Sequence, residues 1–593
     1  MKSRRKKKPV SKKRTKTSHP SRAKKASKDR KDLSLFDGIR YQEEGRFEEA
    51  IAVYRLLIQS QPRNPELYFF TGLAYAESQK FDEAISFLNR AIDLKPNFPE
   101  VVYNMGVVYS ILGKENKAES CYRKISSDDS FFWRAQLNLG TLLGKQDKST
   151  EAIACYKNVI ERSPSVVEAT YNIGVEYETL SDYETAIEYY QKAIRVNPEF
   201  GQAYAAVGSI CEKRNDYSKA EEWSLKALRY NPALFRAYLV LGKVKKARGD
   251  FTNALKLFEK VLELDQGNKE TLYELGYCCE KLKKYDEAFH FFKLANSYTE
   301  ASPIEKEDFL SQISELRTIY RSHKMPISGT VEVDKSKPVF IIGCPRSGTT
   351  LLDQILDSHP RLKSVGECDH IFSTVKALPR ILGRSLSYPD ALGYLLETSS
   401  DERKKLTDHI DREYWEIHNR SRTPDAARIV DKSLINTLYL GLIGLILPRA
   451  AVLHVIRDGR DVAWSAFSTN LKKHVWHANR IEDAFIHWKQ TLQVAREASE
   501  NMNISYLEVC YEDLLQEPET QIRKVLAFIE EDWHSDCLEF YKNKRDVYTA
   551  SYDQVRKNIY RSSVGRAGNY KDQYAFLSDT DRVFLREWGY RNW

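Results

Sequence analysis

No run of apolar residues in this 593-residue chain is long enough to cross a lipid bilayer. The longest run, from Leu438 to Leu447, is followed directly by Pro448, and a membrane-spanning helix needs about 20 apolar residues. The N-terminal segment lacks an apolar core as well, so we do not expect a secretory signal there. Cysteine is sparse, with nine scattered residues, and this odd number does not indicate a disulfide framework. We therefore expect reduced thiols and a cytoplasmic localisation.

Acidic residues are nearly absent from the N-terminal tail, residues 1–30. Together with Lys31, this segment contains sixteen lysines or arginines against Asp29 alone. The tail is therefore more positive than the whole chain, whose net charge is +9, and the remainder is mildly acidic. The tail contains too few apolar groups to offset the conformational entropy that it would lose on ordering, and we therefore expect it to be disordered. Such a tail suits contact with nucleic acid, an anionic membrane or an acidic protein, and it equally suits a purely solvated segment.

Glycine is also infrequent, yet eight of the 26 glycines recur every 34 residues, and an alanine follows each by 12. The glycines are Gly38, Gly72, Gly106, Gly140, Gly174, Gly208, Gly242 and Gly276. This period is the length of a helix-turn-helix unit whose helices bury their apolar faces only against neighbouring units. The small residues mark helix crossings, as Gly72 and Ala84 do, with Leu88 filling the space around them.

The pattern resembles the tetratricopeptide repeat over residues 31–302. The resemblance implies an α-solenoid with a groove that binds a peptide or a protein partner. An arm for oligomerisation is the alternative. Residues 303–335 follow as an amphipathic helix, expected to cap the repeats, and a linker.

A second domain is expected over residues 336–593, where the apolar residues form short unbroken runs. The first run is Pro338–Gly343, and further strands are expected at 427–430, 452–456 and 504–509. Strands that alternate with helical segments predict an α/β domain with a parallel central sheet.

The first strand leads into the loop Gly343-Cys-Pro-Arg-Ser-Gly-Thr-Thr350 and then into a helix. A strand, a turn with two glycines and a helix N-terminus place backbone N–H groups around an anion. The frame is that of a P-loop, but Thr349 stands where a nucleoside triphosphatase has its lysine. The loop therefore predicts a phosphate site and disfavours an ATP or GTP hydrolase or a nucleotide kinase.

The loop Pro345–Thr350 resembles the 5′-phosphosulfate loop of sulfotransferases, and His454–Ser465 resembles their 3′-phosphate element. The resemblance implies that the donor is 3′-phosphoadenosine 5′-phosphosulfate and that no metal is needed. The donor-binding residues that it implies are Arg346, Ser347, Gly348, Thr349, Thr350, Arg457, Ser465, Tyr511, Ser551, Arg556, Arg566 and Lys571.

The segment Val365-Gly366-Glu367, after the loop and its helix, resembles the tyrosylprotein sulfotransferase branch. The resemblance implies that Glu367 is the catalytic base, that Lys432 contacts the bridging oxygen of the donor, and that Arg346 neutralises charge on the sulfuryl group. Cys368-Asp369 departs from the acidic-threonine pair of that branch.

These features predict a sulfotransferase with a protein tyrosine hydroxyl as acceptor and repeats that recruit the substrate or a partner. Glycan and small-molecule hydroxyls stay open as acceptors. A repeat scaffold whose second domain binds nucleotide without catalysis is an alternative of another class. His474, His477 and His487 are interpreted as a solvated helix face rather than a metal site, because no carboxylate ligand pattern accompanies them.

Overall fold

The computed structural model describes residues 33–298, 303–323, 338–398, 400–420, 428–471, 475–502, 504–543 and 563–590. The chain divides into two compact units, residues 1–240 and residues 241–593. The basic tail, Ser551, Arg556 and His474 lie outside the described residues.

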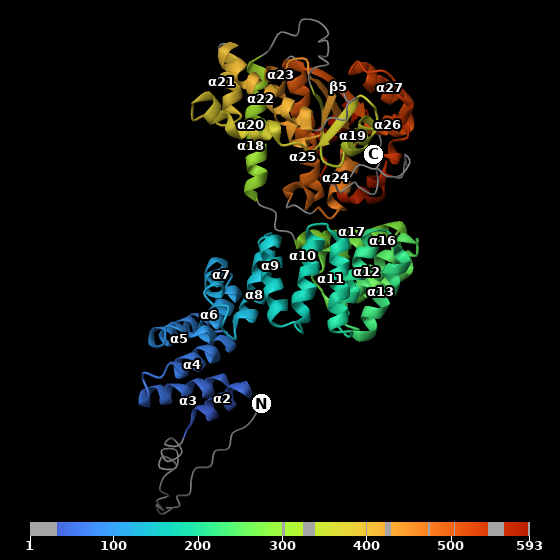
Figure 1. The fold of residues 1–593 in the computed structure, drawn as a ribbon. Helices are drawn as coiled ribbons and strands as arrows, with labels where there is room; N and C mark the ends of the chain where they lie inside the picture. The colour runs from blue at the N-terminus through green and yellow to red at the C-terminus, as the bar shows by residue number, and fades with distance from the viewer. Residues whose placement is uncertain are drawn as a thin grey trace, which may run out of the picture. The chain divides into compact units, whose positions relative to one another are not determined.

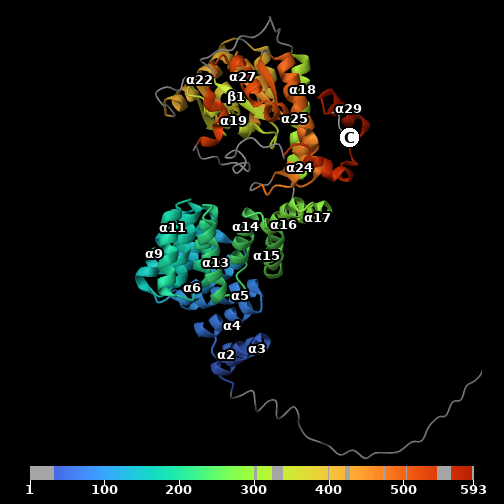
Figure 2. The ribbon, with the colours of Figure 1, turned by 90° about the vertical axis from the view of Figure 1, so that its right-hand side faces the viewer.

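The first unit consists of helices that pair as hairpins and pack in chain order (Figures 1 and 2). The helices are α2 (Leu35–Glu43), α3 (Phe47–Ser60), α4 (Pro65–Glu77), α5 (Phe81–Leu94), α6 (Pro99–Ile111), α7 (Glu115–Arg123), α8 (Phe132–Lys145), α9 (Ser149–Arg162), α10 (Val167–Thr179), α11 (Tyr183–Val196), α12 (Gly201–Lys213) and α13 (Tyr217–Tyr230), with α14 (Phe235–Ala247) at the boundary. The predicted helical solenoid is confirmed.

The recurring glycines allow the two helices of each hairpin to approach closely. A Cβ atom added to Gly38 would lie 2.2 Å from the Tyr54 ring, and one added to Gly174 would lie 2.6 Å from the Tyr190 ring. The same relation holds along the repeats, with the residue sixteen positions after each glycine over the crossing. These residues are Tyr54, Leu88, Tyr122, Tyr156, Tyr190, Ser224, Phe258 and Phe292. The 34-residue spacing in the sequence is therefore the spacing of helix crossings in the fold.

The second unit begins inside the repeats, with α15 (Phe251–Leu264), α16 (Lys269–Lys281) and α17 (Tyr285–Ser297). Phe292 packs edge-on against Trp464 with ring centroids 5.7 Å apart. Asn296 on α17 donates a hydrogen bond to the carbonyl oxygen of Phe467 at 2.9 Å. The final repeat therefore shares an apolar core with the C-terminal domain.

The helix expected at 303–322 forms as α18 (Pro303–Ser322). Its side chains Ile313, Leu316 and Tyr320 are buried in the same core as Phe340 of the central sheet. Arg317 on α18 pairs at 2.8 Å with Glu497 of α25 (Ile481–Asn501). The apolar face of α18 thus belongs to the sheet domain, whereas the sequence predicts only a cap for the repeats. Within the described ranges, no helix combines the length and apolar character of a bilayer-spanning segment.

The sheet has five parallel strands in the order β2-β3-β1-β4-β5. They are β1 (Val339–Gly343), β2 (Leu362–Gly366), β3 (Arg428–Asp431), β4 (Ala451–Ile456) and β5 (Ser505–Cys510). The predicted parallel sheet is confirmed. β2 is not among the strands predicted from the sequence, because it lies at the sheet edge and is only partly buried, so it needs no continuous apolar run.

Helices cover both faces of this sheet. Side chains alternate along β1, so Phe340 and Ile342 join the core formed with α23 (Leu440–Ile446) and α25, while Val339 and Ile341 face α19 (Thr349–Asp357) and α27 (Pro518–Phe528). The helices of the domain are α19 (Thr349–Asp357), α20 (His370–Leu382), α21 (Asp390–Glu397), α22 (Ser400–Arg420), α23 (Leu440–Ile446), α24 (Gly459–Phe467), α26 (Tyr511–Gln516), α27 (Pro518–Phe528) and α29 (Asp579–Glu587), with the short 3₁₀ segments η1 (Leu434–Thr437), η2 (Trp476–Ala478), η3 (Ser535–Leu538), η4 (Phe540–Lys542) and η5 (Arg566–Tyr574).

Candidate active site at the carboxyl edge of the sheet

Polar residues follow the end of every strand. The loop 343–350 follows β1, Glu367 follows β2, Lys432 follows β3, Arg457 follows β4, and Tyr511 follows β5. Because all five strands are parallel, their carboxyl ends lie at the same edge of the sheet. The fold therefore gathers segments that are far apart in the sequence into one region.

The loop after β1 turns sharply into α19. Gly343, Arg346 and Gly348 have φ angles of 150°, 74° and 106°, all in the region that favours glycine. A Cβ atom on Gly348 would lie 2.3 Å from the Tyr511 ring, so both the backbone conformation and the lack of space require glycine at the helix N-cap.

The hydroxyl side chains of this loop are buried. Thr349 and Thr350 occupy the first turn of α19 and are 3% and 8% exposed. Ser347 is 1% exposed, and its Oγ atom has no hydrogen-bond partner within the described part of the chain. A buried hydroxyl without a partner at a helix N-terminus is suited to an anionic ligand, because buried polar groups are otherwise nearly always satisfied.

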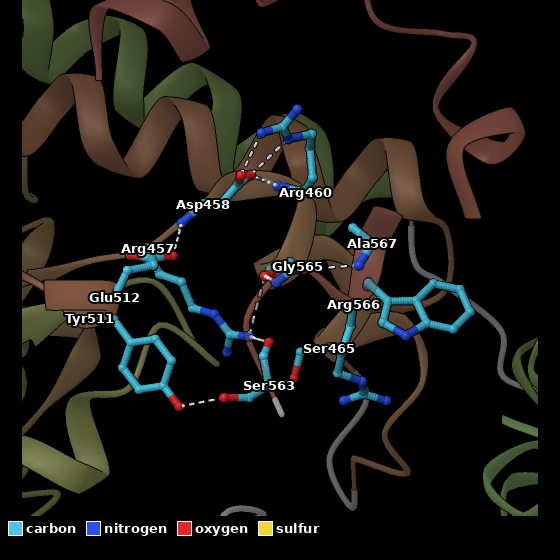
Figure 3. Close-up of polar contacts among 12 residues, drawn as sticks. Arg457, Asp458, Arg460, Ser465, Tyr511, Glu512, Ser563, Gly565, Arg566 and Ala567 are labelled. Carbon is cyan, nitrogen blue, oxygen red and sulfur yellow. Dashed lines mark hydrogen bonds and ion pairs between the residues drawn. The ribbon is translucent and has the colours of Figure 1, made fainter. Parts of the chain in front are cut away.

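Arg457 joins this loop to the C-terminal segment (Figure 3). Its Nη1 atom donates to the carbonyl oxygen of Arg346 at 3.0 Å, and its Nη2 atom donates to that of Ser563 at 2.5 Å. The guanidinium lies 4.7 Å from the Tyr511 ring centroid, and a hydrogen bond of 3.0 Å joins the Tyr511 hydroxyl to Ser563 Oγ. The Nε atom of Arg457 is buried and has no partner in the described residues.

A second contact links the same two predicted elements. The Nε atom of Arg346 donates to the Oγ atom of Ser465 on α24 at 3.0 Å. The loop after β1 and the segment after β4 therefore meet through both Arg457 and Ser465.

Asp461 is not among the site residues predicted from the sequence. Its carboxylate accepts backbone hydrogen bonds from Gly565 at 2.6 Å and Ala567 at 2.9 Å, and it lies 3.9 Å from Arg457 Nη2. Burial raises the pKa of Asp461, and the positive charge of Arg457 opposes this effect. The signal for this residue was its place in the first turn of α24, four residues after the strand-end arginine.

Glu367 and Lys432 form an ion pair. The Lys432 Nζ atom lies 2.7 Å from Glu367 Oε1, the lysine side chain is 3% exposed, and the glutamate side chain is 57% exposed. The backbone N–H of Lys432 also donates to the carbonyl oxygen of Gly366 at 2.9 Å, because β2 and β3 are neighbours. The structure thus brings together the two residues for which the family resemblance implies proton abstraction and charge neutralisation.

Arg566 and Lys571 lie at the C-terminal side of the site, on η5. Arg566 pairs at 2.6 Å with Glu280 of the final repeat. Lys571 is exposed to solvent. Their assignment to the donor site, like that of Ser551 and Arg556, stays a prediction.

For His477 and His487, the interpretation as a solvated helix face was wrong, whereas His474 lies outside the described residues. His477 is 5% exposed, and its ring stacks on that of His487 with centroids 3.9 Å apart. His487 is packed further by Phe309 of α18, and its Nδ1 atom lies 3.3 Å from Cys344 Sγ. The packing of η2 against α25 buries His477 and partly buries His487, which residue type alone does not reveal. Among the described residues, no group of three or more His, Cys, Asp or Glu side chains could hold a metal ion.

Comparison with known families agrees with this architecture. A family model described as "Sulfotransferase family" matches residues 338–535. Tetratricopeptide repeat models match residues 38–99, 99–127, 134–166 and 167–200, and a model described as "Anaphase-promoting complex, cyclosome, subunit 3" matches residues 213–294.

Individual relatives match parts of the chain. A protein of Aquifex aeolicus (strain VF5) named "Uncharacterized protein" is 31% identical over 352 residues, which are 54% of this chain and 42% of that protein, so the chain spans less than half of this relative. Protein-tyrosine sulfotransferase A of Caenorhabditis elegans is 26% identical over 263 residues, 42% of this chain and 67% of that protein. A solved tetratricopeptide repeat protein from Parabacteroides merdae is 19% identical and aligns with 41% of this chain and 96% of its own, with a TM-score of 0.36. The chain therefore combines tetratricopeptide repeats with a C-terminal domain of the sulfotransferase family.

Proposed function

We propose that the C-terminal domain transfers a sulfuryl group from 3′-phosphoadenosine 5′-phosphosulfate to an acceptor hydroxyl. The observation that carries this proposal is the junction at Arg346, which contacts both Arg457 and Ser465. A donor with phosphate groups at both ends needs two neighbouring anion sites, and a planar guanidinium is suited to bind phosphate oxygens.

The residues of the site fit such a donor. Ser347 Oγ and Arg457 Nε are buried without a protein partner in the described ranges, one in each of the two predicted phosphate-binding elements. The first turn of α19 supplies backbone N–H groups and the positive end of the helix dipole. When bound, the donor supplies the sulfuryl group and a phosphate leaving group.

The ion pair beside this loop supplies the remaining chemistry. Glu367 is exposed at the surface, so it can reach the hydroxyl of a large acceptor and accept its proton. The buried ammonium of Lys432 stabilises negative charge that develops on the bridging oxygen, and Arg346 does the same at the sulfuryl oxygens. By analogy with phosphoryl transfer, positioning and electrostatics provide the rate enhancement.

A protein tyrosine is the acceptor that we propose, and the name of the C. elegans relative supports it. The repeats would recruit the protein that carries this tyrosine and so raise its local concentration. A hollow of about 450 Å³ lies on the repeats of the first unit, lined by apolar side chains such as Val207 and Trp223 and by charged ones such as Arg214 and Glu222. Such a lining can bind a peptide with both apolar and charged residues.

The acceptor is tested by incubating the full chain with radiosulfur-labelled donor and a cell extract that contains protein, glycan and lipid. We expect label in protein, recovered as sulfotyrosine after hydrolysis. Label confined to glycan, lipid or small molecules would refute the tyrosine assignment and leave the transferase. No transfer to any fraction, with donor bound, would favour a scaffold with a nucleotide-binding domain.

We also propose a reducing compartment, because all nine cysteines carry free thiols and most are buried. The basic tail is proposed as a contact for nucleic acid, an anionic membrane or an acidic protein.

A further inference from the structure

Glu280, at the end of α16 in the final repeat, is the point where three side chains of the sheet domain converge. Its carboxylate accepts hydrogen bonds from Arg566 Nη2 at 2.6 Å and from Arg566 Nε at 3.4 Å. It also accepts from Trp464 Nε1 at 3.2 Å and from the Tyr570 hydroxyl at 3.4 Å. One residue of the repeats thus contacts both α24 and η5.

The surroundings of this carboxylate are largely shielded from solvent. The Glu280 side chain is 10% exposed and that of Arg566 is 27% exposed. The Trp464 and Tyr570 rings stack with centroids 3.5 Å apart, and Tyr285 of α17 packs edge-on against Tyr570. Burial lowers the pKa of Arg566, but the charge of Glu280 outweighs this effect, so the pKa lies above its ordinary value and the guanidinium stays charged.

Two of the three side chains bound by Glu280 adjoin the candidate active site. Trp464 directly precedes Ser465, the residue that contacts Arg346. Arg566 directly follows Gly565, whose backbone N–H is bound by Asp461. In Figure 3 the Arg566 side chain extends in the same direction as that of Ser465.

We infer that Glu280 is a positioning residue for the donor nucleotide, and this inference rests on the proposed function. By fixing Arg566 and the indole of Trp464, it holds η5 and α24 in the arrangement that receives a phosphate group of the donor. The final repeat is therefore part of the donor-binding apparatus, and donor affinity depends on its docking against the sheet domain.

The direction in which neutralisation of Glu280 changes nucleotide affinity distinguishes a positioning role from competition for Arg566. If Glu280 only competed with phosphate for Arg566, its neutralisation would strengthen nucleotide binding. A positioning role predicts the opposite, because two of the three guanidinium nitrogens are occupied by the carboxylate and set the orientation of the third. Hydrogen bonds from three different side chains also indicate that the Glu280 carboxylate is held in one position and does not exchange between partners.

The test is calorimetric titration of the full chain with adenosine 3′,5′-bisphosphate. We expect Glu280→Gln to bind roughly tenfold more weakly than the wild type, since a charge-assisted hydrogen bond is lost. Glu280→Asp keeps the charge and should bind more tightly than Glu280→Gln. The matched control is Glu287→Gln, on the neighbouring helix, whose side chain is 55% exposed and pairs with Lys284; it should bind as the wild type does.

A double-mutant cycle with Arg566→Ala shows whether Glu280 acts through Arg566. The Glu280→Gln change should have little further effect in the Arg566→Ala background. Equal losses in both backgrounds, unchanged affinity or tighter binding would overturn the inference, as would equal affinities of the Gln and Asp variants. A wild-type chain that does not bind the bisphosphate would instead refute the donor site itself.

Discussion

Replacing Lys432 by alanine removes the ammonium group whose Nζ atom lies 2.7 Å from Glu367 Oε1. A unit charge about 4 Å from developing negative charge contributes about 4 kcal/mol at an effective dielectric constant of about 20. Solvent on the exposed side of Glu367 screens part of this, so we expect turnover to fall on the order of 100-fold, or about 2.7 kcal/mol. Glu367→Gln removes the proton acceptor and should lower turnover by at least as much.

The assay is the initial rate of radiosulfur transfer to the fraction that the wild-type chain labels, with donor affinity measured in parallel. Lys489→Ala is the matched control, because its Nζ atom pairs with Asp581 at the same distance of 2.7 Å. That variant should keep wild-type turnover. Near-normal rates for Lys432→Ala and Glu367→Gln would refute the proposed chemistry, provided that both variants melt as the wild type does.

Three further outcomes follow from other parts of the structure. Arg457→Lys keeps the charge but loses one of two hydrogen bonds, so calorimetry should show nucleotide affinity lowered roughly tenfold, whereas Arg523→Lys on the exposed face of α27 should bind normally. Burial lowers the pKa of His477 from 6.5 to about 4, so between these pH values the unfolded chain binds a proton that the folded chain does not. The contribution of His477 to the free energy of unfolding is therefore fully present above pH 6.5 and falls by about 1.4 kcal/mol per pH unit as the pH decreases toward 4. Urea titrations that show no such decrease would contradict this. Gly174→Val collides with a buried ring and should lower the free energy of unfolding by about 1–3 kcal/mol, whereas Gly267→Ala meets open space and should be neutral in the same denaturation experiment.

The repeats could be predicted from the sequence because their signal is local and periodic. Each glycine and the residue sixteen positions later meet at one helix crossing, so the spacing itself encodes the contact. β2 gives no such signal, because an edge strand needs only one buried side and its sequence Leu-Lys-Ser-Val-Gly is half polar.

The clustering of the candidate site residues was predictable where they directly follow strands. Arg457 and Lys432 stand at strand ends, and the parallel sheet brings such ends together. Glu280 was not predictable, since it lies 286 residues from Arg566 and on a helix whose pattern indicates only a repeat. Burial of His477 depends likewise on how η2 packs against α25, which no local pattern specifies.

The most direct measurement is calorimetric titration of the full chain with adenosine 3′,5′-bisphosphate and, separately, with adenosine 5′-monophosphate. If the segments after β1 and β4 bind two phosphate groups of one nucleotide, the bisphosphate should bind at a single site and at least about tenfold more tightly than the monophosphate, because only the bisphosphate engages both anion sites. No binding of the bisphosphate, or equal affinity for the two nucleotides, would contradict a shared donor site at Arg346 and Arg457.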